Sequence, residues 1–286
     1  MTHTQRDAVL ISATALNTLL TGQQTVSILA VRSDDTSCPR PYKIAPRIPG
    51  AIDTNMAEDF AAPSHPLNGS RPLPEHTQLE QTIRRLGLKR DNPIVVYDHD
   101  GNLQAARVWW VLRWAGFKNV RMLDGGFKAW TDLALPISHT PPPIPTPSEE
   151  SIYIGQMPVM DADAAAQLAR NGILLDSRIQ TNYIGGVTPA GLPRRGHIPG
   201  AHSLPAPDNL AENGQFLDQE TLRALYTSRG VKSAYPVGVY CGAGVSAAHN
   251  VAALMMLGIT APMYPGSWSA WISDPARPVA TGDMPG

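Results

Sequence analysis

The stretch VGVYCGAGVSAAHNVAALM, residues 237–255, joins a short apolar run to a helical pattern through one cysteine and two glycines. It predicts a strand, a tight loop around Cys241 and a helix from Val245 to Leu257. A cysteine at such a junction lies near backbone N–H groups that lack intrahelical partners and near the positive end of the helix dipole. Gly242 and Gly244 have no Cβ, so the loop can curl with its amides pointing inward. The stretch predicts a site for a sulfur anion, with a buried structural thiol as the alternative.

The energy needed to hold a thiolate here indicates which groups take part. An ordinary thiol has a pKa near 8.5, and lowering it by about two units needs ~2.7 kcal/mol. A helix terminus supplies at most ~2 kcal/mol. The rest must come from a nearby guanidinium, from the Ser246 hydroxyl or from loop amides; Ser246 has a second interpretation as an ordinary N-terminal helix residue. The predicted persulfide-cradling loop consists of Gly242, Ala243, Gly244, Val245, Ser246 and Ala247.

Length, charge and cysteine content limit the possible functions. The 286 residues suggest two domains, and 23 basic against 24 acidic side chains indicate neither a nucleic-acid nor a membrane partner. No run of 18 apolar residues occurs, so no transmembrane span is expected, and Ala8–Leu20 is interpreted as the first helix of a domain. Cys38 and Cys241 are too few and too far apart for a disulfide framework or a metal site. We expect a cytoplasmic protein without a metal, in which Cys38 is a free thiol.

An internal repeat organises the chain. Five landmarks recur in the same order at an offset of about 140 to 150 residues, which indicates a tandem duplication. They are Ile11–Leu20 with Val159–Leu168, Val26–Arg32 with Ile173–Arg178, Arg47–Ala51 with His197–Ala201, Ile94–Tyr97 with Val237–Tyr240, and Leu123–Trp130 with Tyr264–Trp271. Each half therefore opens with a helix that is followed by a strand.

The stretch between the halves is dense in proline and is expected to be extended and semi-rigid. The predicted domains are 1–137 and 153–286, with 138–152 as a linker. Short Val/Ile-rich strands alternate with helical segments such as Leu103–Trp114, which predicts a parallel sheet flanked by helices in each half. The three tryptophans of Leu103–Trp114 are expected to pack in the core. Ligands of such sheets bind at the carboxyl ends of strands, where Cys241 is located.

The repeat shows where the two halves differ in chemistry. Aligning the Val/Ile-Tyr strands sets Asp98 opposite Cys241, so only the second half carries a nucleophile. We interpret the Asp98 segment as a helix-capping loop.

Six motifs carry a resemblance to a known family: Gly69–Pro74, Ala106–Trp110, Leu123–Gly126, His197–Gly200, Cys241–Ala247 and Pro265–Trp271. With them the chain resembles the tandem-domain rhodaneses, sulfurtransferases that act on thiosulfate or 3-mercaptopyruvate. The resemblance covers nearly the whole chain and implies an α/β fold with two tandem rhodanese-like domains and no cofactor. It implies that Cys241 takes up a sulfur atom as a persulfide and passes it to cyanide or to a thiol, such as that of a thioredoxin-like protein.

The resemblance leaves the donor open. Thiosulfate-type loops of the family have cations directly after the cysteine, whereas Gly242 and Ala243 favour the mercaptopyruvate type. The mercaptopyruvate pattern, however, has a serine at Ala243, an acid at Asn55 and a histidine at Arg71. All three side chains of that acid/base relay are missing. Asp53 replaces the acid only if the register slips by two residues.

The family's carboxylate-binding arginine is also replaced. Its position corresponds to Asn182, in the sequence Asn-Tyr-Ile-Gly. Arg194, Arg195 and Arg71 are the candidate substitutes, each with an alternative as a solvated surface arginine. Trp268 is a candidate for lining the donor site, with core packing as its alternative.

Two alternative functions also place a cysteine in such a loop. A cysteine-loop phosphatase needs an arginine at the sixth position after the cysteine, and Ala247 occupies that position, so this function is rejected. The second is a persulfide carrier or sensor that keeps the cysteine but turns over donors weakly, which the missing family residues favour.

Overall fold

The computed structural model describes residues 5–22, 24–32, 46–187, 192–232 and 235–286, so Cys38 lies outside the described residues. Contacts divide the chain into two compact units that match the two halves of the repeat, except that each also takes a short segment from the other half. Unit 1 comprises Met1–Ala62, Leu73–Gln156 and Leu210–Phe216, and unit 2 comprises Pro63–Pro72, Met157–Asn209 and Leu217–Gly286.

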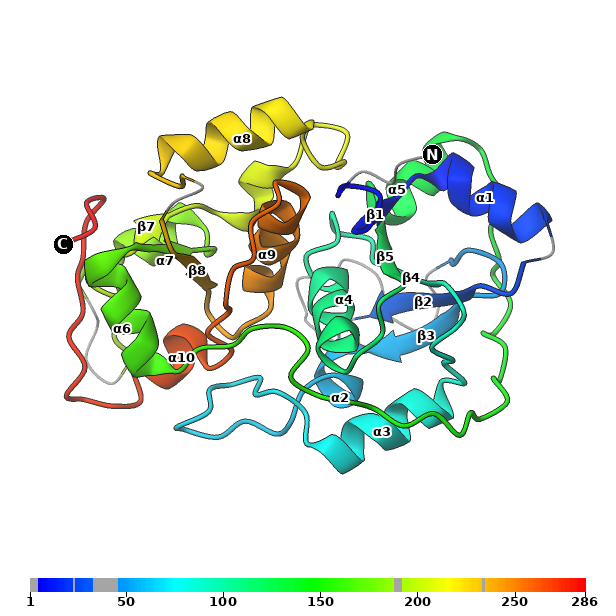
Figure 1. The fold of residues 1–286 in the computed structure, drawn as a ribbon, viewed down its shortest axis with the longest axis horizontal. Helices are drawn as coiled ribbons and strands as arrows, with labels where there is room; N and C mark the ends of the chain where they lie inside the picture. Colours follow the sequence, from blue (N-terminus) through cyan, green and yellow to red (C-terminus); the bar gives the residue numbers. More distant parts are fainter. Residues whose placement is uncertain (1–4, 23, 33–45, 188–191, 233–234) are drawn as a thin grey trace. The chain divides into compact units, whose positions relative to one another are not determined.

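Unit 1 is built on a parallel sheet with strand order β1-β5-β4-β2-β3 (Figure 1). The strands are β1 (Leu10–Ile11), β2 (Ser27–Arg32), β3 (Ile52–Asn55), β4 (Ile94–Tyr97) and β5 (Val120–Leu123). The helices are α1 (Ala13–Thr21), α2 (Met56–Asp59), α3 (His76–Arg85), α4 (Ala105–Trp114) and α5 (Gly126–Asp132). This arrangement confirms the predicted parallel sheet flanked by helices.

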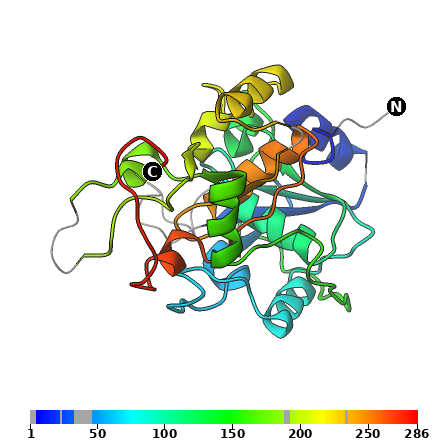
Figure 2. The same ribbon diagram turned by 60° about the vertical axis from the view of Figure 1, so that its left-hand side comes forward.

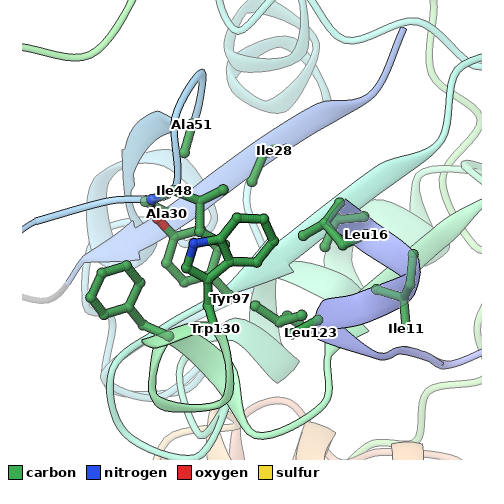
Figure 3. Packing of buried hydrophobic residues seen from close by; sticks show 12 residues of the cluster. Ile11, Leu16, Ile28, Ala30, Ile48, Ala51, Tyr97, Leu123 and Trp130 are labelled. Carbon is green, nitrogen blue, oxygen red and sulfur yellow. Dashed lines mark hydrogen bonds between the residues drawn. The ribbon is translucent and has the colours of Figure 1, made fainter. Parts of the chain in front are cut away.

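Both faces of this sheet are covered, which explains why β4 is apolar along its whole length. On one face, Leu16 of α1 and Trp130 of α5 pack onto Ile28 and Tyr97 (Figure 3). On the other face lies α4, whose Trp109 is fully buried and donates its indole N–H to the Val120 carbonyl over 3.1 Å. The tryptophans of α4 are core residues, as predicted.

Unit 2 repeats the same plan with a shorter ladder, β7-β6-β8, all parallel. Its strands are β6 (Ile173–Asp176), β7 (His202–Ser203) and β8 (Val237–Tyr240). Single bridges from Met263 to Val239 and to Val159 continue the sheet beyond β8, in the places that β5 and β1 take in unit 1. The helices are α6 (Ala162–Asn171), α7 (Gln180–Ile184), α8 (Gln219–Ser228), α9 (Ser246–Met256) and α10 (Ser267–Trp271), with a 3-10 turn at Ala206–Asn209. In Figure 1, α6 and α9 lie on opposite sides of this small sheet.

The duplication is visible in individual hydrogen bonds. The Tyr97 hydroxyl accepts the Ile48 N–H over 3.0 Å in unit 1, and the Tyr240 hydroxyl accepts the Ile198 N–H over 3.1 Å in unit 2. Each unit thus ties the strand before its loop to its Ile-Pro-Gly turn in the same way.

Four helices start later than their sequence pattern predicts. The expectation of a helix over Ala8–Leu20 is corrected, because Leu10–Ile11 pair with β5 as strand β1 and α1 begins at Ala13, where the Ser12 side chain accepts the N–H of Ala15. Helix α6 begins at Ala162 because the Asp161 side chain accepts the N–H of Ala164 over 2.8 Å and caps it there. Helix α4 begins at Ala105 because the preceding residues wrap around Asp98. Helix α9 begins at Ser246, one residue after the predicted start.

The proline-dense stretch 138–152 forms no helix or strand, in agreement with its predicted extended form. It belongs to unit 1, where Ser138 exchanges backbone hydrogen bonds with Arg47 and the Ser148 N–H donates to the Arg84 carbonyl. These bonds hold the predicted linker on unit 1.

The last residues of the chain fold back along unit 2. The His197 N–H donates to the Ala280 carbonyl over 2.9 Å, and the Gly282 N–H donates to the Ile184 carbonyl over the same distance. Figure 2 shows this segment, in red, beside the loop that follows α7. Gly196 is needed at this contact because its φ is 120° and a Cβ there would lie 2.1 Å from the Ala280 oxygen.

Candidate active site

Cys241 directly follows β8, at the carboxyl end of the strand, and α9 begins five residues later. Its thiol is free and the residue is only 1% exposed. The loop bends at Gly244, whose φ of 73° lies in the left-handed region that favours glycine. The predicted strand, loop and helix are therefore confirmed, with the cysteine where a parallel sheet places its ligands.

The start of α10 closes the other side of the loop. The Trp268 N–H donates to the Cys241 carbonyl and the Ser269 N–H donates to the Gly242 carbonyl, each over 2.9 Å. Trp268 is 7% exposed and belongs to the core cluster of unit 2, so its ring packs in the interior and its backbone holds the loop.

Ser267 is the side chain that approaches the sulfur. Its hydroxyl oxygen accepts the Cys241 N–H over 3.1 Å and lies 3.9 Å from Cys241 Sγ, within hydrogen-bonding reach of sulfur. The hydroxyl also donates to the Tyr264 carbonyl over 2.8 Å, and the residue is fully buried. No local sequence pattern points to Ser267. A comparison of the two halves of the repeat could have identified this residue, because the corresponding residue of the first half is Gly126.

A buried ion pair supports the same loop. Arg178 donates from Nε and Nη2 to the Asp176 carboxylate, over 2.5 to 3.0 Å, and from Nη2 to the Gly196 carbonyl over 2.6 Å. Its guanidinium lies 4.5 Å from the centre of the Trp268 ring, and its Cδ is 3.8 Å from where a Cβ on Gly242 would be. Burial lowers the pKa of Arg178, but the Asp176 carboxylate outweighs this and leaves the pKa raised, so the guanidinium stays charged.

The proposed substitutes for the missing arginine occupy different places. Arg194 donates to the carbonyl oxygens of Ile272, Asp274 and Arg277, which gives it a structural role at the end of α10. Arg195 is exposed, as is Asn182 on α7.

Arg71 is half-buried on the segment Pro63–Pro72, which belongs to unit 2. The neighbouring Ser70 N–H donates over 3.0 Å to the hydroxyl of Ser269, whose own N–H donates to the Gly242 carbonyl. Gly69 permits this approach, because a Cβ there would lie 2.5 Å from the Gly266 oxygen. Two hydrogen-bonded steps therefore connect the residue next to Arg71 with the Cys241 loop.

The two candidates for the acid of the family's relay, Asn55 and Asp53, have structural roles. The Asn55 side chain accepts the N–H groups of Ala57 and Glu58 and caps α2. Asp53 pairs with Arg32 and Arg47, over 3.2 and 2.7 Å.

The loop of unit 1 that corresponds to the Cys241 loop holds the side chain of Asp98. Asp98 is 3% exposed, and its carboxylate accepts four backbone N–H groups over 2.7 to 2.9 Å. The donors are Asp100, Asn102, Gln104 and Ala105. Burial raises the pKa of Asp98, although each of these hydrogen bonds acts to lower it. As interpreted, the segment caps α4, because Asp98 accepts the N–H of Ala105, the first residue of the helix, and the loop is filled by a carboxyl group of the chain itself.

Asp98→Ala is expected to lower the free energy of unfolding by about 2 to 4 kcal/mol, because four N–H groups lose an ionised acceptor in a buried site. The shift of the unfolding midpoint in urea measures this. Asp100→Ala, which removes an exposed carboxylate from the same loop, is the matched control and should change stability by less than about 0.5 kcal/mol. Equal effects of the two substitutions would contradict the role of Asp98.

Behind the loop, α9 is fixed by a buried polar network. The Asn209 amide donates to His249 Nδ1 over 3.1 Å and to the Asn250 side chain over 2.6 Å, and the Tyr226 hydroxyl donates to the Asn209 oxygen over 3.0 Å. His249 is therefore part of the scaffold of α9. Among the described residues no group of histidines, cysteines and acids has the arrangement of a metal site, and no described helix is long and apolar enough to cross a membrane.

Comparisons with known proteins agree with this geometry. The family model of the rhodanese-like domain matches residues 12–133 and 161–274. SseB of Mycobacterium tuberculosis is 39% identical over 97% of this chain and 98% of its own length. The 3-mercaptopyruvate sulfurtransferase of Escherichia coli is 31% identical over 78% of this chain and 79% of that protein. The thiosulfate sulfurtransferase of Mus musculus is 30% identical over 78% of this chain and 76% of that protein. The crystal structure of YnjE has a TM-score of 0.83 at 26% identity, over 96% of this chain and 69% of that one.

Proposed function

Because the chain belongs to the rhodanese family and contains its domain twice, we propose that it is a sulfurtransferase in which Cys241 carries the sulfur as a persulfide. The observation that supports this most directly is the buried thiol of Cys241 in a loop whose copy in unit 1 holds a carboxylate on four amides. The proposed donor is a small sulfur-bearing anion, thiosulfate or 3-mercaptopyruvate.

The first half-reaction loads the cysteine. The Cys241 thiolate attacks the outer sulfur of thiosulfate, a sulfur–sulfur bond forms, and the bond to the sulfonate sulfur breaks so that sulfite leaves with the electron pair. With 3-mercaptopyruvate the carbon–sulfur bond breaks instead, and the enolate of pyruvate takes up a proton. In both cases the thiolate becomes a persulfide without an external oxidant.

The second half-reaction returns the cysteine to its starting state. Cyanide or a thiolate attacks the outer sulfur of the persulfide, and the Cys241 thiolate leaves with its electron pair. Thiocyanate or a new persulfide is the product. A thioredoxin-like protein is one acceptor of the required chemistry, and a reducing compartment such as the cytoplasm suits a free thiol with this role.

Backbone donors of the Cys241 loop are the proposed source of the stabilisation that the sulfur anion requires. By the register of the repeat, the N–H groups of Ala243, Val245 and Ala247 correspond to three of the four that bind Asp98, while the fourth, the Ala248 N–H, donates to the Val245 carbonyl over 3.1 Å. Bonds from N–H groups to an ionised acceptor contribute about 1.5 to 3 kcal/mol each in a buried site. These amides and the N-terminus of α9 are therefore the groups that we propose to hold the sulfur anion.

The donor experiment separates the possible substrates. The protein is incubated with thiosulfate or with 3-mercaptopyruvate, and the mass of the peptide that contains Cys241 is measured. Gain of one sulfur atom with either donor, removed again by cyanide, supports the proposal and identifies the donor. If neither donor adds sulfur to Cys241, the proposal is wrong.

A persulfide carrier or sensor is the second candidate, supported by the exposed Asn182 and by the engagement of Arg194 with carbonyl groups. The two functions differ in turnover. A carrier takes up one sulfur per cysteine and transfers it slowly, whereas a sulfurtransferase completes many cycles with donor and cyanide in excess. Steady-state thiocyanate production, compared with the single-turnover yield, distinguishes them.

We expect the donor's anionic group to be bound by Arg71, with Arg195 as the next candidate. Arg71→Gln should raise the Michaelis constant for the donor about 5- to 20-fold, because a charge-assisted hydrogen bond is lost, and leave kcat within about twofold. Arg195→Gln tests the second candidate. Arg223→Gln removes an exposed arginine on α8 of the same unit and controls for net charge. If all three variants have the same Michaelis constant as the unaltered protein, neither candidate binds the donor.

A further inference from the structure

The backbone of Ser267 adopts a conformation that serine rarely takes. Its φ is 52°, in the left-handed region, where a Cβ meets the neighbouring carbonyl. Glycine would adopt this backbone conformation at a lower cost, but it could neither accept the Cys241 N–H nor donate to the Tyr264 carbonyl. The contacts of the hydroxyl therefore offset the strain, and one of its neighbours is the Cys241 sulfur.

In unit 1 the same turn is made with a glycine, which adopts this backbone conformation without strain. The corresponding residue, Gly126, has a φ of 58°, and the N–H of the next residue, Phe127, donates to the Asp98 carbonyl over 2.9 Å. In unit 2 the next residue, Trp268, makes the same bond to the Cys241 carbonyl. The turn is thus the same in both copies, and the glycine is present in the copy that has no nucleophile.

The Ser267 hydroxyl lies among three groups, the Cys241 N–H, the Cys241 sulfur and the Tyr264 carbonyl. It accepts the backbone N–H of Cys241 and donates to the Tyr264 carbonyl, and its oxygen is 3.9 Å from Cys241 Sγ. The hydroxyl has one hydrogen, which can point either to the Tyr264 carbonyl or to the sulfur. A thiol needs no donor, whereas a thiolate attracts one.

We infer that Ser267 is a catalytic hydroxyl, which turns its hydrogen from the Tyr264 carbonyl to Cys241 Sγ when that sulfur is ionised. This inference rests on the proposed role of Cys241 and names the group beside its sulfur. It accounts for the strained φ, because only a residue with a Cβ can carry a hydroxyl there. It also supplies a side-chain donor to a loop in which Ala243 carries none. The proton stays on the serine oxygen throughout, so Ser267 stabilises the anion without acting as a base.

Two substitutions separate the hydroxyl from the backbone. Ser267→Ala removes the hydroxyl and keeps the strained Cβ, while Ser267→Gly removes both. Because glycine accepts a φ of 52° without penalty, the Gly variant should melt several degrees higher than the Ala variant. Both variants lose the hydroxyl equally, so both should be impaired equally in sulfur chemistry.

The first measurement is the pKa of the Cys241 thiol, without any donor. The rate of alkylation by iodoacetamide is followed against pH at the peptide that contains Cys241. Loss of a hydrogen bond to the charged form should raise the thiol pKa by about half a unit to one unit in both variants. The second measurement is kcat/KM with the donor identified above, which should fall about 3- to 10-fold in both, in step with the thiolate fraction at neutral pH.

The outcomes are distinguishable. Equal rises of the thiol pKa in two variants of different melting temperature support the catalytic hydroxyl. If the thiol pKa is unchanged in both, or if reactivity follows melting temperature from one variant to the other, Ser267 is a structural residue and the inference is overturned. Since the alkylation assay needs no donor, it decides the role of Ser267 even if Cys241 takes sulfur from neither thiosulfate nor 3-mercaptopyruvate.

Discussion

Cys241→Ser is expected to lower thiocyanate production by at least about a thousandfold, because the reaction then lacks its nucleophile. A serine hydroxyl is almost wholly un-ionised at neutral pH and its oxygen forms no persulfide. The substitution exchanges one buried atom for a smaller one at a residue that is 1% exposed, so the fold should be retained. Cyanide-coupled turnover with saturating donor measures the loss.

Cys38→Ser is the matched control, since it removes the other cysteine of the chain. It should retain the full rate, and circular dichroism of both variants should equal that of the unaltered protein. A Cys241→Ser variant that keeps more than about a tenth of the rate would contradict the assignment of the nucleophile. A Cys38→Ser variant that loses the rate would show that a second thiol takes part.

Asp176→Ala should lower the free energy of unfolding by about 3 to 5 kcal/mol, because it leaves the buried Arg178 guanidinium without its counter-ion. Asp176 is fully buried and also accepts the backbone N–H of Arg178 over 3.0 Å. Urea-induced unfolding, followed by far-ultraviolet circular dichroism, measures the change. Activity should fall as well, because Arg178 packs against the Trp268 ring and lies close to Gly242 of the loop.

The double substitution Asp176→Ala with Arg178→Met provides the control for this prediction. It removes the charge together with its partner and keeps an apolar chain against Trp268, so it should cost less than the single substitution. The opposite order, with the double variant less stable than the single one, would show that Arg178 stabilises unit 2 by its other contacts and that the ion pair is secondary.

Local patterns in the sequence were sufficient to predict much of this fold. The apolar run Ile94–Tyr97 and its repeat Val237–Tyr240 are strands with the predicted bounds, because both are buried on two faces and leave no polar alternative. The position of Cys241 could be predicted for the same reason, since a strand end, two glycines and a helix start lie together in the chain. The start of α4 was less predictable because the Asp98 side chain takes the N–H groups that would begin the helix earlier.

The residues around the nucleophile were harder to predict because they meet it through the fold. Ser267 follows Cys241 by 26 residues, and its approach depends on how α10 packs under the loop. Arg194 looked like an anion-binding residue because it stands beside Arg195 and the His-Ile-Pro-Gly motif. Its partners are carbonyl groups about 80 residues later in the chain, and no local pattern reveals them.

Because the loop of unit 1 is filled by the Asp98 carboxylate, the two copies of the loop differ in their ability to bind solutes. A loop that is filled by a side chain of the protein itself is occupied at any concentration of solute. An oxidant or an alkylating agent therefore finds no binding site in it. In the proposed reaction the Cys241 loop instead alternates between a thiolate and a persulfide. The duplication has thus left unit 1 with a loop that is always occupied, while the proposed sulfur chemistry is confined to the loop of unit 2.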